Sequence, residues 1–334
     1  MDREHVDKIK KLLLTACRYT LPGFKKIERM EERLEQMRKQ LDSLSNTSVV
    51  RKKHELYQYY SNLFEIGTYV GVRAQKRSPA LTVSFTTMPI RLPRVHLTIE
   101  SLLRQSIQPD RLILWLDHES FDSIELPIAL RRQEERGLEI QYCDNLLSYK
   151  KLIPALEKYP QDVIVTCDDD AFYPRDWLEK LYRAHLADPQ TVQCHRAHRI
   201  LFEGSEMKPY RQWEYETKVH EPSFLVFPTG VGGILYPPGA LHEDVLDRGQ
   251  FLSLAPRADD VWFKAMCVKN GVRSHLVEKN APMDKGEIRD AIFVVPDTQE
   301  VALYKTNYFQ DDNDKQIRAT FDAHGIIERL RSAA

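Results

Sequence analysis

The chain has 334 residues, of which 42 % are hydrophobic and 29 % are charged, and its formal net charge is −1. This length allows one large α/β domain with an appendage, or two modest domains. The near-neutral balance excludes a general electrostatic attraction to nucleic acid, and no apolar run reaches transmembrane length. Residues 1–80 contain 17 Lys and Arg against 10 Asp and Glu, whereas the remainder contains 31 against 39. A basic N-terminal part therefore precedes an acidic remainder, which favours a surface or partner contact by the N-terminus.

The cysteines are scattered, and none of them has the spacing of metal ligands. This pattern predicts free, buried thiols in a reducing compartment. The charged N-terminus is unlike a secretory signal peptide. We therefore expect a cytoplasmic protein, with peripheral contact at the inner face of the membrane as a further interpretation. The five cysteines are Cys17, Cys143, Cys167, Cys194 and Cys267.

Residues 1–78 show a helical pattern with few strand-like runs. Their apolar side chains form a coiled-coil seam of nearly three heptads, spaced alternately three and four residues apart. Two interpretations stay open: a helical hairpin packed on the main domain, or a homodimer seam with a basic amphipathic helix on an anionic membrane. We assign residues 1–78 to an N-terminal helical or coiled-coil segment. The seam consists of Ile27, Met30, Leu34, Met37, Leu41 and Leu44.

From residue 79 the pattern changes to strands that alternate with helices, which predicts βαβ units and a mostly parallel sheet. Ligands of such sheets bind beyond the carboxyl ends of the strands. We expect one α/β domain over residues 79–334 with its site at that edge. The expected strands cover residues 81–85, 111–116, 139–142 and 162–167, and the expected helices cover residues 95–103, 124–136, 149–159 and 177–187.

Three aspartates, Asp168, Asp169 and Asp170, follow the strand expected at residues 162–167. Adjacent carboxylates repel each other, and neither strand nor helix formation requires three of them. A helix N-cap would need only one Asp, whereas a hard divalent cation prefers several oxygen ligands. Alternation along an extended segment places Asp168 and Asp170 on one side and Asp169 on the other. The sequence thus predicts Asp168 and Asp170 as ligands of Mn²⁺ or Mg²⁺.

Several motifs occur in a characteristic order between residues 80 and 280. A first strand ends in Val83–Thr87, the aspartate triplet follows the fourth strand, and Gly232-Gly233 precedes Ala258-Asp259-Asp260. Together they resemble a family-2-like glycosyltransferase of the GT-A type, with the triplet in the place of the D-x-D motif. The aspartate pair is similar to the family's E/D-D motif, although Ala258 stands where a Glu is usual. The remaining C-terminal part is similar only to bacterial polysaccharide and lipopolysaccharide glycosyltransferases.

The resemblance implies a GT-A fold that binds a nucleoside diphosphate sugar, with a UDP-sugar favoured. It further implies sugar transfer with inversion to a glycan or lipid-linked glycan, in bacterial surface polysaccharide synthesis. An acceptor hydroxyl must lose its proton as it attacks, so Asp260 is the expected general base and Asp259 the second choice. His275 lies where some GT-A enzymes place a third metal ligand, although a structural role is commoner for a single His.

Binding of the donor requires cations and polar groups near its phosphates. The loop after the first strand, the start of the helix at 149–159 and the basic run after residue 194 supply them. A solvated surface or a basic edge strand explains the same residues without a ligand. The residues assigned to the donor are Thr86, Arg91, Lys150, Lys151, Asp169, His195 and Arg196.

Two other functions stay open. A sugar nucleotidyltransferase has a similar sheet and metal-binding acids, but it usually carries a Gly-rich loop after the first strand, and Thr86–Arg91 contains no glycine. A non-catalytic scaffold with a degenerate transferase body would not need both acidic motifs. Nucleic-acid binding is the least favoured, because the remainder of the chain is acidic and shows no basic-aromatic stripe.

Overall fold

The computed structural model describes residues 51–277, 292–294 and 312–333. The chain divides into two compact units, Met1–Glu55 and Leu56–Ala334. The predicted seam at residues 27–44 lies outside the described residues, so the homodimer, the membrane contact and the domain boundary after residue 78 stay predictions. Within the described part of the chain, no helix is long and apolar enough to cross a membrane.

Residues 51–65 are helical, whereas residues 66–78 contain neither helix nor strand. The helical pattern expected up to residue 78 therefore ends earlier. The backbone N–H of Gly71 donates to the carbonyl of Arg136, and that of Arg73 donates to the carbonyl of Pro109. These N–H groups are bonded to loops next to the sheet, so they are not available to a helical ladder.

The second unit is built on a seven-stranded sheet with the strand order β12-β6-β11-β4-β1-β2-β3. β11 runs antiparallel to β4 and β6, and the other neighbours are parallel. The predicted α/β class with a mostly parallel sheet is thus confirmed. The strands are β1 (Leu81–Thr86), β2 (Arg111–Asp117), β3 (Leu138–Cys143), β4 (Val163–Thr166), β6 (Val192–Cys194), β11 (Ile234–Tyr236) and β12 (Ser274–Leu276).

Shorter strands pair outside this sheet. Two of the three pairs connect segments that are distant in sequence, and β13 in particular returns the chain to the segment after β4. The pairs are β5 (Ala171–Phe172) with β13 (Phe293–Val294), β7 (Ala197–Arg199) with β10 (Val226–Pro228), and β8 (Phe202–Glu203) with β9 (Glu206–Met207).

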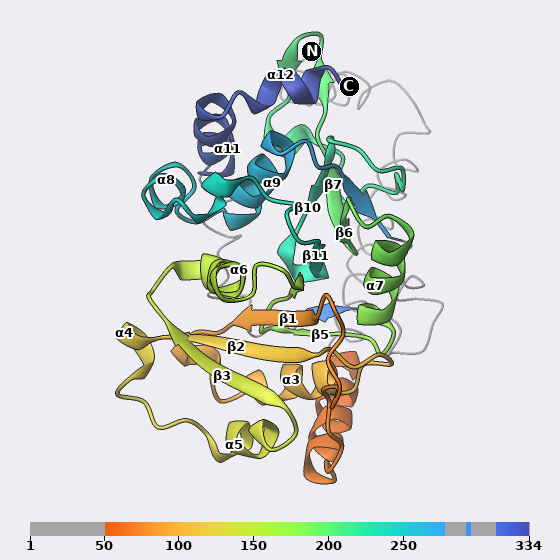
Figure 1. Ribbon diagram of the computed structural model, residues 1–334, viewed down its shortest axis with the longest axis vertical. Helices are drawn as coiled ribbons and strands as arrows, with labels where there is room; N and C mark the ends of the chain where they lie inside the picture. The colour runs from red at the N-terminus through yellow and green to blue at the C-terminus, as the bar shows by residue number, and fades with distance from the viewer. Residues whose placement is uncertain (1–50, 278–291, 295–311, 334) are drawn as a thin grey trace, which may run out of the picture. The chain divides into compact units, whose positions relative to one another are not determined.

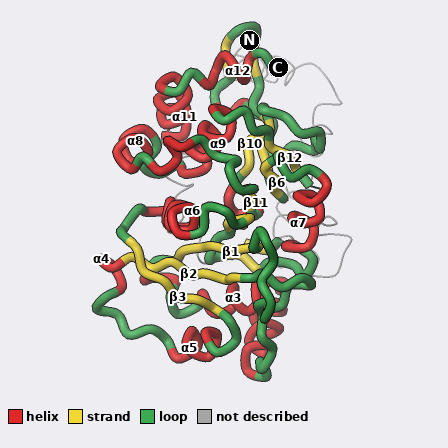
Figure 2. The backbone as a smooth tube through the Cα atoms, in the orientation of Figure 1, coloured by secondary structure: helices red, strands yellow, loops and turns green. Residues whose placement is uncertain are grey.

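Both faces of the sheet are buried, which explains the continuous apolar runs of its strands. Alternate residues of β2 point into two different hydrophobic cores: Ile113 and Trp115 into one, and Leu112, Leu114 and Leu116 into the other. Figures 1 and 2 show α3 and α5 on one face of β1, β2 and β3, and α6 on the opposite face. We call the core under α3, α5 and α7 the α3-side core, and the core with α6, α8, α9 and α11 the α9-side core.

Two expected helices are shorter than their apolar patterns suggested. The helix expected at residues 124–136 begins only after Pro127, and the one expected at 149–159 is split into η2 and α6 next to Pro154. Proline lacks the N–H that an interior helical position needs, so it stands at these starts. The helices are η1 (Pro89–Arg91), α3 (Val95–Leu103), α4 (His118–Phe121), α5 (Ile128–Glu134), η2 (Leu147–Lys151), α6 (Ile153–Lys158), α7 (Trp177–Ala187), η3 (Tyr210–Gln212), η4 (Gly230–Gly232), η5 (Glu243–Leu246), α8 (Arg248–Leu254), α9 (Asp259–Lys269), α11 (Asp312–Ala323) and α12 (Ile326–Arg331).

The turn before β11 is fixed by a close contact with α7. Gly233 has a φ of 89°, and a Cβ added to it would lie 2.4 Å from Cζ2 of Trp177. The indole N–H of Trp177 donates to the carbonyl of Gly232 over 2.8 Å. Glycine is therefore required at residue 233 both for its backbone conformation and for the space that the indole occupies.

We expect Gly233→Ala to lower the free energy of unfolding by about 3 kcal/mol or more, because overpacking adds to the conformational cost. Gly239→Ala is the matched control, since Gly239 has a φ of 72° with nothing within 4 Å of an added Cβ. Its expected cost is about 1 kcal/mol, from backbone conformation alone. Urea unfolding of both variants measures the difference, and equal losses would contradict the packing argument.

Candidate functional site

The candidate site lies at the carboxyl ends of β4, β1 and β2. Ser84 is paired with Thr166, and Thr86 with Trp115, so the residues that follow these three parallel strands come together at one edge. Because β11 is antiparallel, its first residue, Ile234, lies opposite Thr166. The glycine turn η4, which precedes β11, therefore reaches the same edge as the ends of its neighbours.

The aspartate triplet forms a turn between β4 and β5 rather than an extended segment. Lys151 Nζ lies 3.1 Å from Asp168 Oδ1. Arg91 contacts the other two aspartates, with Nη1 2.5 Å from Asp169 Oδ1 and Nη2 3.1 Å from Asp170 Oδ2. The expected alternation fails because the segment turns, so Asp169 and Asp170 share one guanidinium while Asp168 contacts a different cation.

The second acidic motif begins α9 and reaches the same place. Lys151 Nζ lies 3.0 Å from Asp259 Oδ2. The backbone N–H of Gly230 donates to Asp260 Oδ2 over 3.0 Å. Asp260 Oδ1 is buried and has no hydrogen-bond partner among the described residues. The structure thus brings the triplet and the Asp259-Asp260 pair together around one lysine and one glycine turn.

The charges of this cluster change each other's proton affinities. Burial, together with the charge of neighbouring Asp259, raises the pKa of Asp260 to about 7. Burial also raises the pKa of Asp169, against the opposing effect of Arg91. Burial acts to lower the pKa of Lys151, but the surrounding carboxylates, Asp168 first, bring it well above its ordinary value. Lys151 therefore stays charged, while Asp260 titrates near neutral pH.

Lys150 and Lys151 reach in different directions from the end of η2. The ammonium of Lys150 pairs with Asp117 Oδ2 at the end of β2, whereas Lys151 lies among the carboxylates beyond β4. Thr86 ends β1 between them, and its hydroxyl donates to the carbonyl of Trp115 over 2.8 Å. The two lysines thus connect the ends of β2 and β4.

The basic run after β6 divides into two environments. His195 is buried, its Nε2 lies 2.9 Å from the carbonyl of Trp177, and burial lowers its pKa to about 4. Arg196 stays near the glycine turn, because its Nη1 donates to Thr229 Oγ1 over 2.8 Å. The assignment of both residues to the donor stays a prediction, and the geometry supports Arg196 more than the buried, neutral His195.

His275 lies on β12, where its Nδ1 is 2.6 Å from Oε1 of Gln193 on the paired strand β6. Among the described residues, the triplet and His275 do not form a group of three metal-ligand side chains within 4.8 Å of one another. The group that does is His242, Glu243 and Asp244. Its Asp244 is already paired with Lys269. The metal assignment of His275 therefore stays a prediction without geometric support.

The carboxylates beyond β4 do fit a divalent cation. The side chain of Asp168 is 28 % exposed, so its carboxylate faces solvent at the edge of the sheet, and that of Asp170 is 7 % exposed. Carboxylate oxygens are the hard ligands that Mn²⁺ and Mg²⁺ prefer. An ammonium already lies beside Asp168, which shows that this position attracts positive charge.

Sequence reasoning missed three residues of this cluster. Tyr173 accepts the N–H of Asp168 over 2.9 Å, and its hydroxyl lies 3.3 Å from the carbonyl of Val231, so it ties the triplet to the glycine turn. Asp117 ends β2 and binds Lys150. Gly230 approaches the acids so closely that a Cβ there would lie 3.2 Å from Asp260 Oδ1. The signal for Asp117 was present, because it is a carboxylate that directly follows a buried strand.

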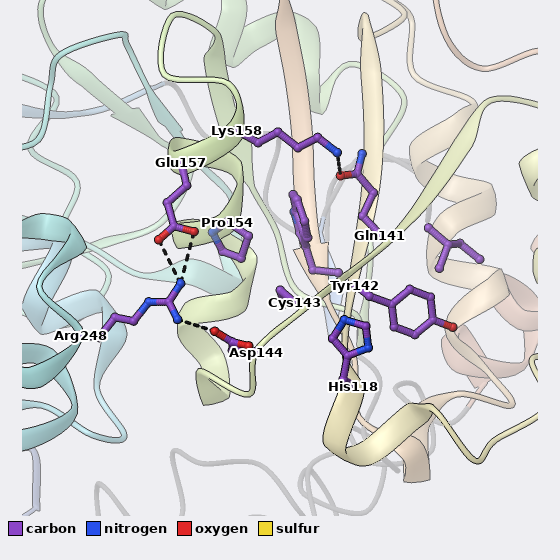
Figure 3. A pocket seen from close by; sticks show the side chains of 11 residues that line it. His118, Gln141, Tyr142, Cys143, Asp144, Pro154, Glu157, Lys158 and Arg248 are labelled. Carbon is purple, nitrogen blue, oxygen red and sulfur yellow. Dashed lines mark hydrogen bonds and ion pairs between the residues drawn. The ribbon is translucent and has the colours of Figure 1, made fainter.

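A pocket of about 710 Å³ lies between α6 and the carboxyl-terminal halves of β2 and β3 (Figure 3). The rings of His118 and Tyr142 stack at one end, with centroids 5.3 Å apart. Arg248 contacts Asp144 and Glu157 at another side. His118 directly follows Asp117, the partner of Lys150, so this part of the pocket lies next to the end of β2.

Comparison with known proteins identifies this region. Residues 90–235 match the family model described as Glycosyl transferase family 2. This segment is thus similar to family 2 glycosyltransferases. It includes Arg91, the lysine pair and the aspartate triplet, whereas Asp259 and Asp260 follow it. The resemblance inferred from the motifs is thereby confirmed.

The other comparisons add less. No curated protein matches the chain. A similar solved structure is that of the mannosyltransferase PcManGT from Pyrobaculum calidifontis in complex with GDP-Man and Mn²⁺. It is 17 % identical, the match covers 83 % of this chain and 82 % of that chain, and the TM-score is 0.40.

Asp260→Asn should remove a pH dependence of stability between about pH 4 and 7. Native Asp260, with a pKa of about 7 against an ordinary value of 3.8, keeps a proton that the unfolded chain has lost. Stability from this group is therefore full below the unfolded pKa and is lost as pH rises through the folded pKa. Denaturant unfolding at pH 5 and 8 should show the wild type losing more stability than the variant. Asp176→Asn, at a 46 % exposed side chain, is the control, and parallel profiles for wild type and Asp260→Asn would refute the expectation.

Proposed function

We propose that the chain transfers a sugar from a nucleoside diphosphate sugar to a hydroxyl of a glycan or lipid-linked glycan, with inversion, in the synthesis of a bacterial surface polysaccharide. One observation carries the proposal. Two acidic motifs that are far apart in sequence, at Asp168 and at Asp259-Asp260, converge on Lys151 at the carboxyl edge of the sheet. A donor diphosphate needs cations at that edge, and an acceptor hydroxyl needs a base there.

On the donor side, the lysine pair supplies positive charge between the ends of β2 and β4. A nucleoside in the pocket between α6 and β3 would lie beside Lys150, and its diphosphate would extend towards Lys151 and Asp168. Stacking on the ring of His118 or Tyr142 suits a planar base. Arg91 orients Asp169 and Asp170 through two ion pairs. In this arrangement Asp169 contributes to the donor site through Arg91.

Asp168 and Asp170 are the proposed ligands of Mn²⁺ or Mg²⁺. When bound, the ion would neutralise charge that develops on the departing diphosphate. Lys151, at the end of η2, adds a fixed positive charge at the same edge of the sheet. A buried ammonium is worth more to a developing negative charge than one in water, because the local dielectric constant is lower.

On the acceptor side, Asp260 is better suited than Asp259 to act as the general base. Asp259 Oδ2 lies 3.0 Å from the ammonium of Lys151, so this carboxylate is already engaged in an ion pair. Asp260 is oriented through one oxygen by Gly230, its other oxygen is without a partner among the described residues, and its pKa is about 7. Such a group accepts a proton from an attacking hydroxyl near neutral pH. Attack by that hydroxyl in a single displacement inverts the anomeric centre.

Nucleoside diphosphates should stabilise the native protein against heat when Mn²⁺ is present. UDP, GDP, CDP and TDP are each tested with Mn²⁺ or with EDTA, because a ligand of the native state raises the melting temperature by mass action. We expect a shift with one nucleotide that requires Mn²⁺ and disappears in Asp168→Ala/Asp170→Ala. Asp176→Asn should keep it. If no nucleotide shifts the wild type, the donor assignment is wrong and the scaffold function becomes the better explanation.

The stacked rings of the pocket should contribute to nucleotide binding but not to chemistry. Tyr142→Ala should weaken binding of the nucleotide found above by about tenfold, because stacking of a base on an aromatic ring contributes on the order of 1–3 kcal/mol. Calorimetric titration with Mn²⁺ measures this loss. Tyr69→Ala removes an aromatic ring of similar exposure, 43 % against 40 %, that does not line the pocket. Equal affinities in the two variants would exclude the pocket as the nucleoside site.

Sugar transfer should lose on the order of 10²–10⁴-fold in Asp260→Asn, the usual contribution of a general base. In the wild type, kcat/KM should rise with pH through about 7 and then level off, because the base acts only when it is deprotonated. Asp259→Asn tests the second choice. Near-full activity in both variants would refute the assignment of the base, and release of pyrophosphate from a nucleoside triphosphate would favour a nucleotidyltransferase instead.

A further inference from the structure

Lys151 is the point at which the two acidic motifs meet. Lys151 is 7 % exposed, and its Nζ lies 3.1 Å from Asp168 Oδ1 and 3.0 Å from Asp259 Oδ2. Asp168 belongs to the end of β4 and Asp259 to the start of α9. One buried ammonium thus connects carboxylates from the two halves of the site, and a buried charge is retained only where it is paired.

The position of this ammonium is fixed from two sides. The carbonyl of Lys151 accepts the hydroxyl of Ser84 over 2.7 Å, and that hydroxyl also receives the indole N–H of Trp115 over 3.0 Å. On the opposite side, a Cβ added to Gly230 would lie 2.6 Å from Lys151 Nζ. The sheet therefore anchors the backbone of the lysine, and the glycine turn closes over its tip.

A cation in this place affects any other cation that approaches Asp168. The ammonium occupies part of the coordination space of the carboxylate, and its charge repels a divalent ion at close range in a medium of low dielectric constant. A donor diphosphate reverses this effect, because its negative charge attracts the ammonium and the ion together.

We propose that Lys151 and the divalent ion compete for Asp168, so that the protein binds the ion weakly by itself and takes it up together with the donor diphosphate. This inference rests on the proposed function, since it assumes a donor and an ion at Asp168. Lys151 is a positioning residue in this scheme. Without a donor, its ammonium holds the triplet and Asp259 together. With a donor, the ammonium also interacts with the phosphates. The order of binding is then set by the side chain rather than by the ion.

The test measures Mn²⁺ affinity directly, by electron paramagnetic resonance titration of free Mn²⁺, with and without the nucleoside diphosphate that stabilises the wild type. We expect Lys151→Met to bind Mn²⁺ without nucleotide at least about tenfold more tightly than the wild type, since one opposite charge nearby changes the cation affinity of a carboxylate by 10-fold or more. Lys151→Met should also lose most of the gain in Mn²⁺ affinity that nucleotide gives the wild type. A purely structural role predicts the opposite, a weaker site.

Two variants serve as controls. Lys150→Met removes an equally buried ammonium that pairs with Asp117 instead, and it should leave Mn²⁺ affinity without nucleotide unchanged. Lys151→Arg keeps the charge and should keep the weak affinity of the wild type, which also provides a readout if Lys151→Met does not fold. Equal or weaker Mn²⁺ binding by folded Lys151→Met, or tighter binding by Lys151→Arg, overturns the inference.

The competition for Asp168 and the proposed function can be refuted separately. If the wild type shows Mn²⁺-dependent nucleotide binding but Lys151→Met binds Mn²⁺ no more tightly, the competition is wrong and the proposed function is unaffected. If the wild type binds no nucleoside diphosphate with Mn²⁺, the proposed function fails, and the inference fails with it.

Discussion

The site depends on one electrostatic constraint, which is that carboxylates brought to a buried edge need cations beside them. Parallel strands deliver the residues after β1, β2 and β4 to one place, and several of these residues are acidic. Arg91, Lys150 and Lys151 are placed so that each contacts at least one of them. Removing a partner from such a pair costs more than the pair itself contributes, because the remaining charge stays buried. The loops that carry these cations are therefore as constrained as the strands.

The arrangement places the acids proposed to bind a cation beside the acid proposed as the general base. The carboxylates that pair with Arg91 or Lys151 have the oxygen ligands that a divalent cation prefers. Asp260 receives the backbone N–H of Gly230, but its burial and the charge of Asp259 raise its pKa to about 7. Environments that push the proton affinities of neighbouring acids apart are a common way to assign different roles to the same side chain. For Asp260 the main cause of the shift is burial.

Much of this could be predicted from the sequence. The apolar runs at residues 111–116 and 162–167 identified buried strands, and acids placed directly after a strand end fall at the ligand edge of a parallel sheet. The motif resemblance singled out the distant pair Asp259-Asp260, which the structure places beside Lys151 and Gly230, while its role as the base stays a prediction. Extended alternation was the wrong rule for the triplet, because a turn follows Thr166 and places Asp169 and Asp170 on one guanidinium.

Other features depend on tertiary packing and leave little trace in the sequence. The antiparallel direction of β11, which brings Gly230 to the acids, follows from no local pattern. His195 is buried with its ring against the carbonyl of Trp177, the first residue of the preceding helix α7. A run of basic residues looks the same whether its side chains face a ligand or a core, so only the structure separates Arg196 from His195.

The sheet separates two hydrophobic cores in the second unit. The residues next to the two acidic motifs pack in different cores. Val165 and Cys167, just before the triplet, pack in the α3-side core, whereas Val261 and Trp262, just after the aspartate pair, pack in the α9-side core. A molecule bound between the two motifs would therefore contact residues that are supported by both cores. Such a molecule would connect the two cores, and a shift of one core relative to the other would change the distance between the proposed metal ligands and the proposed base.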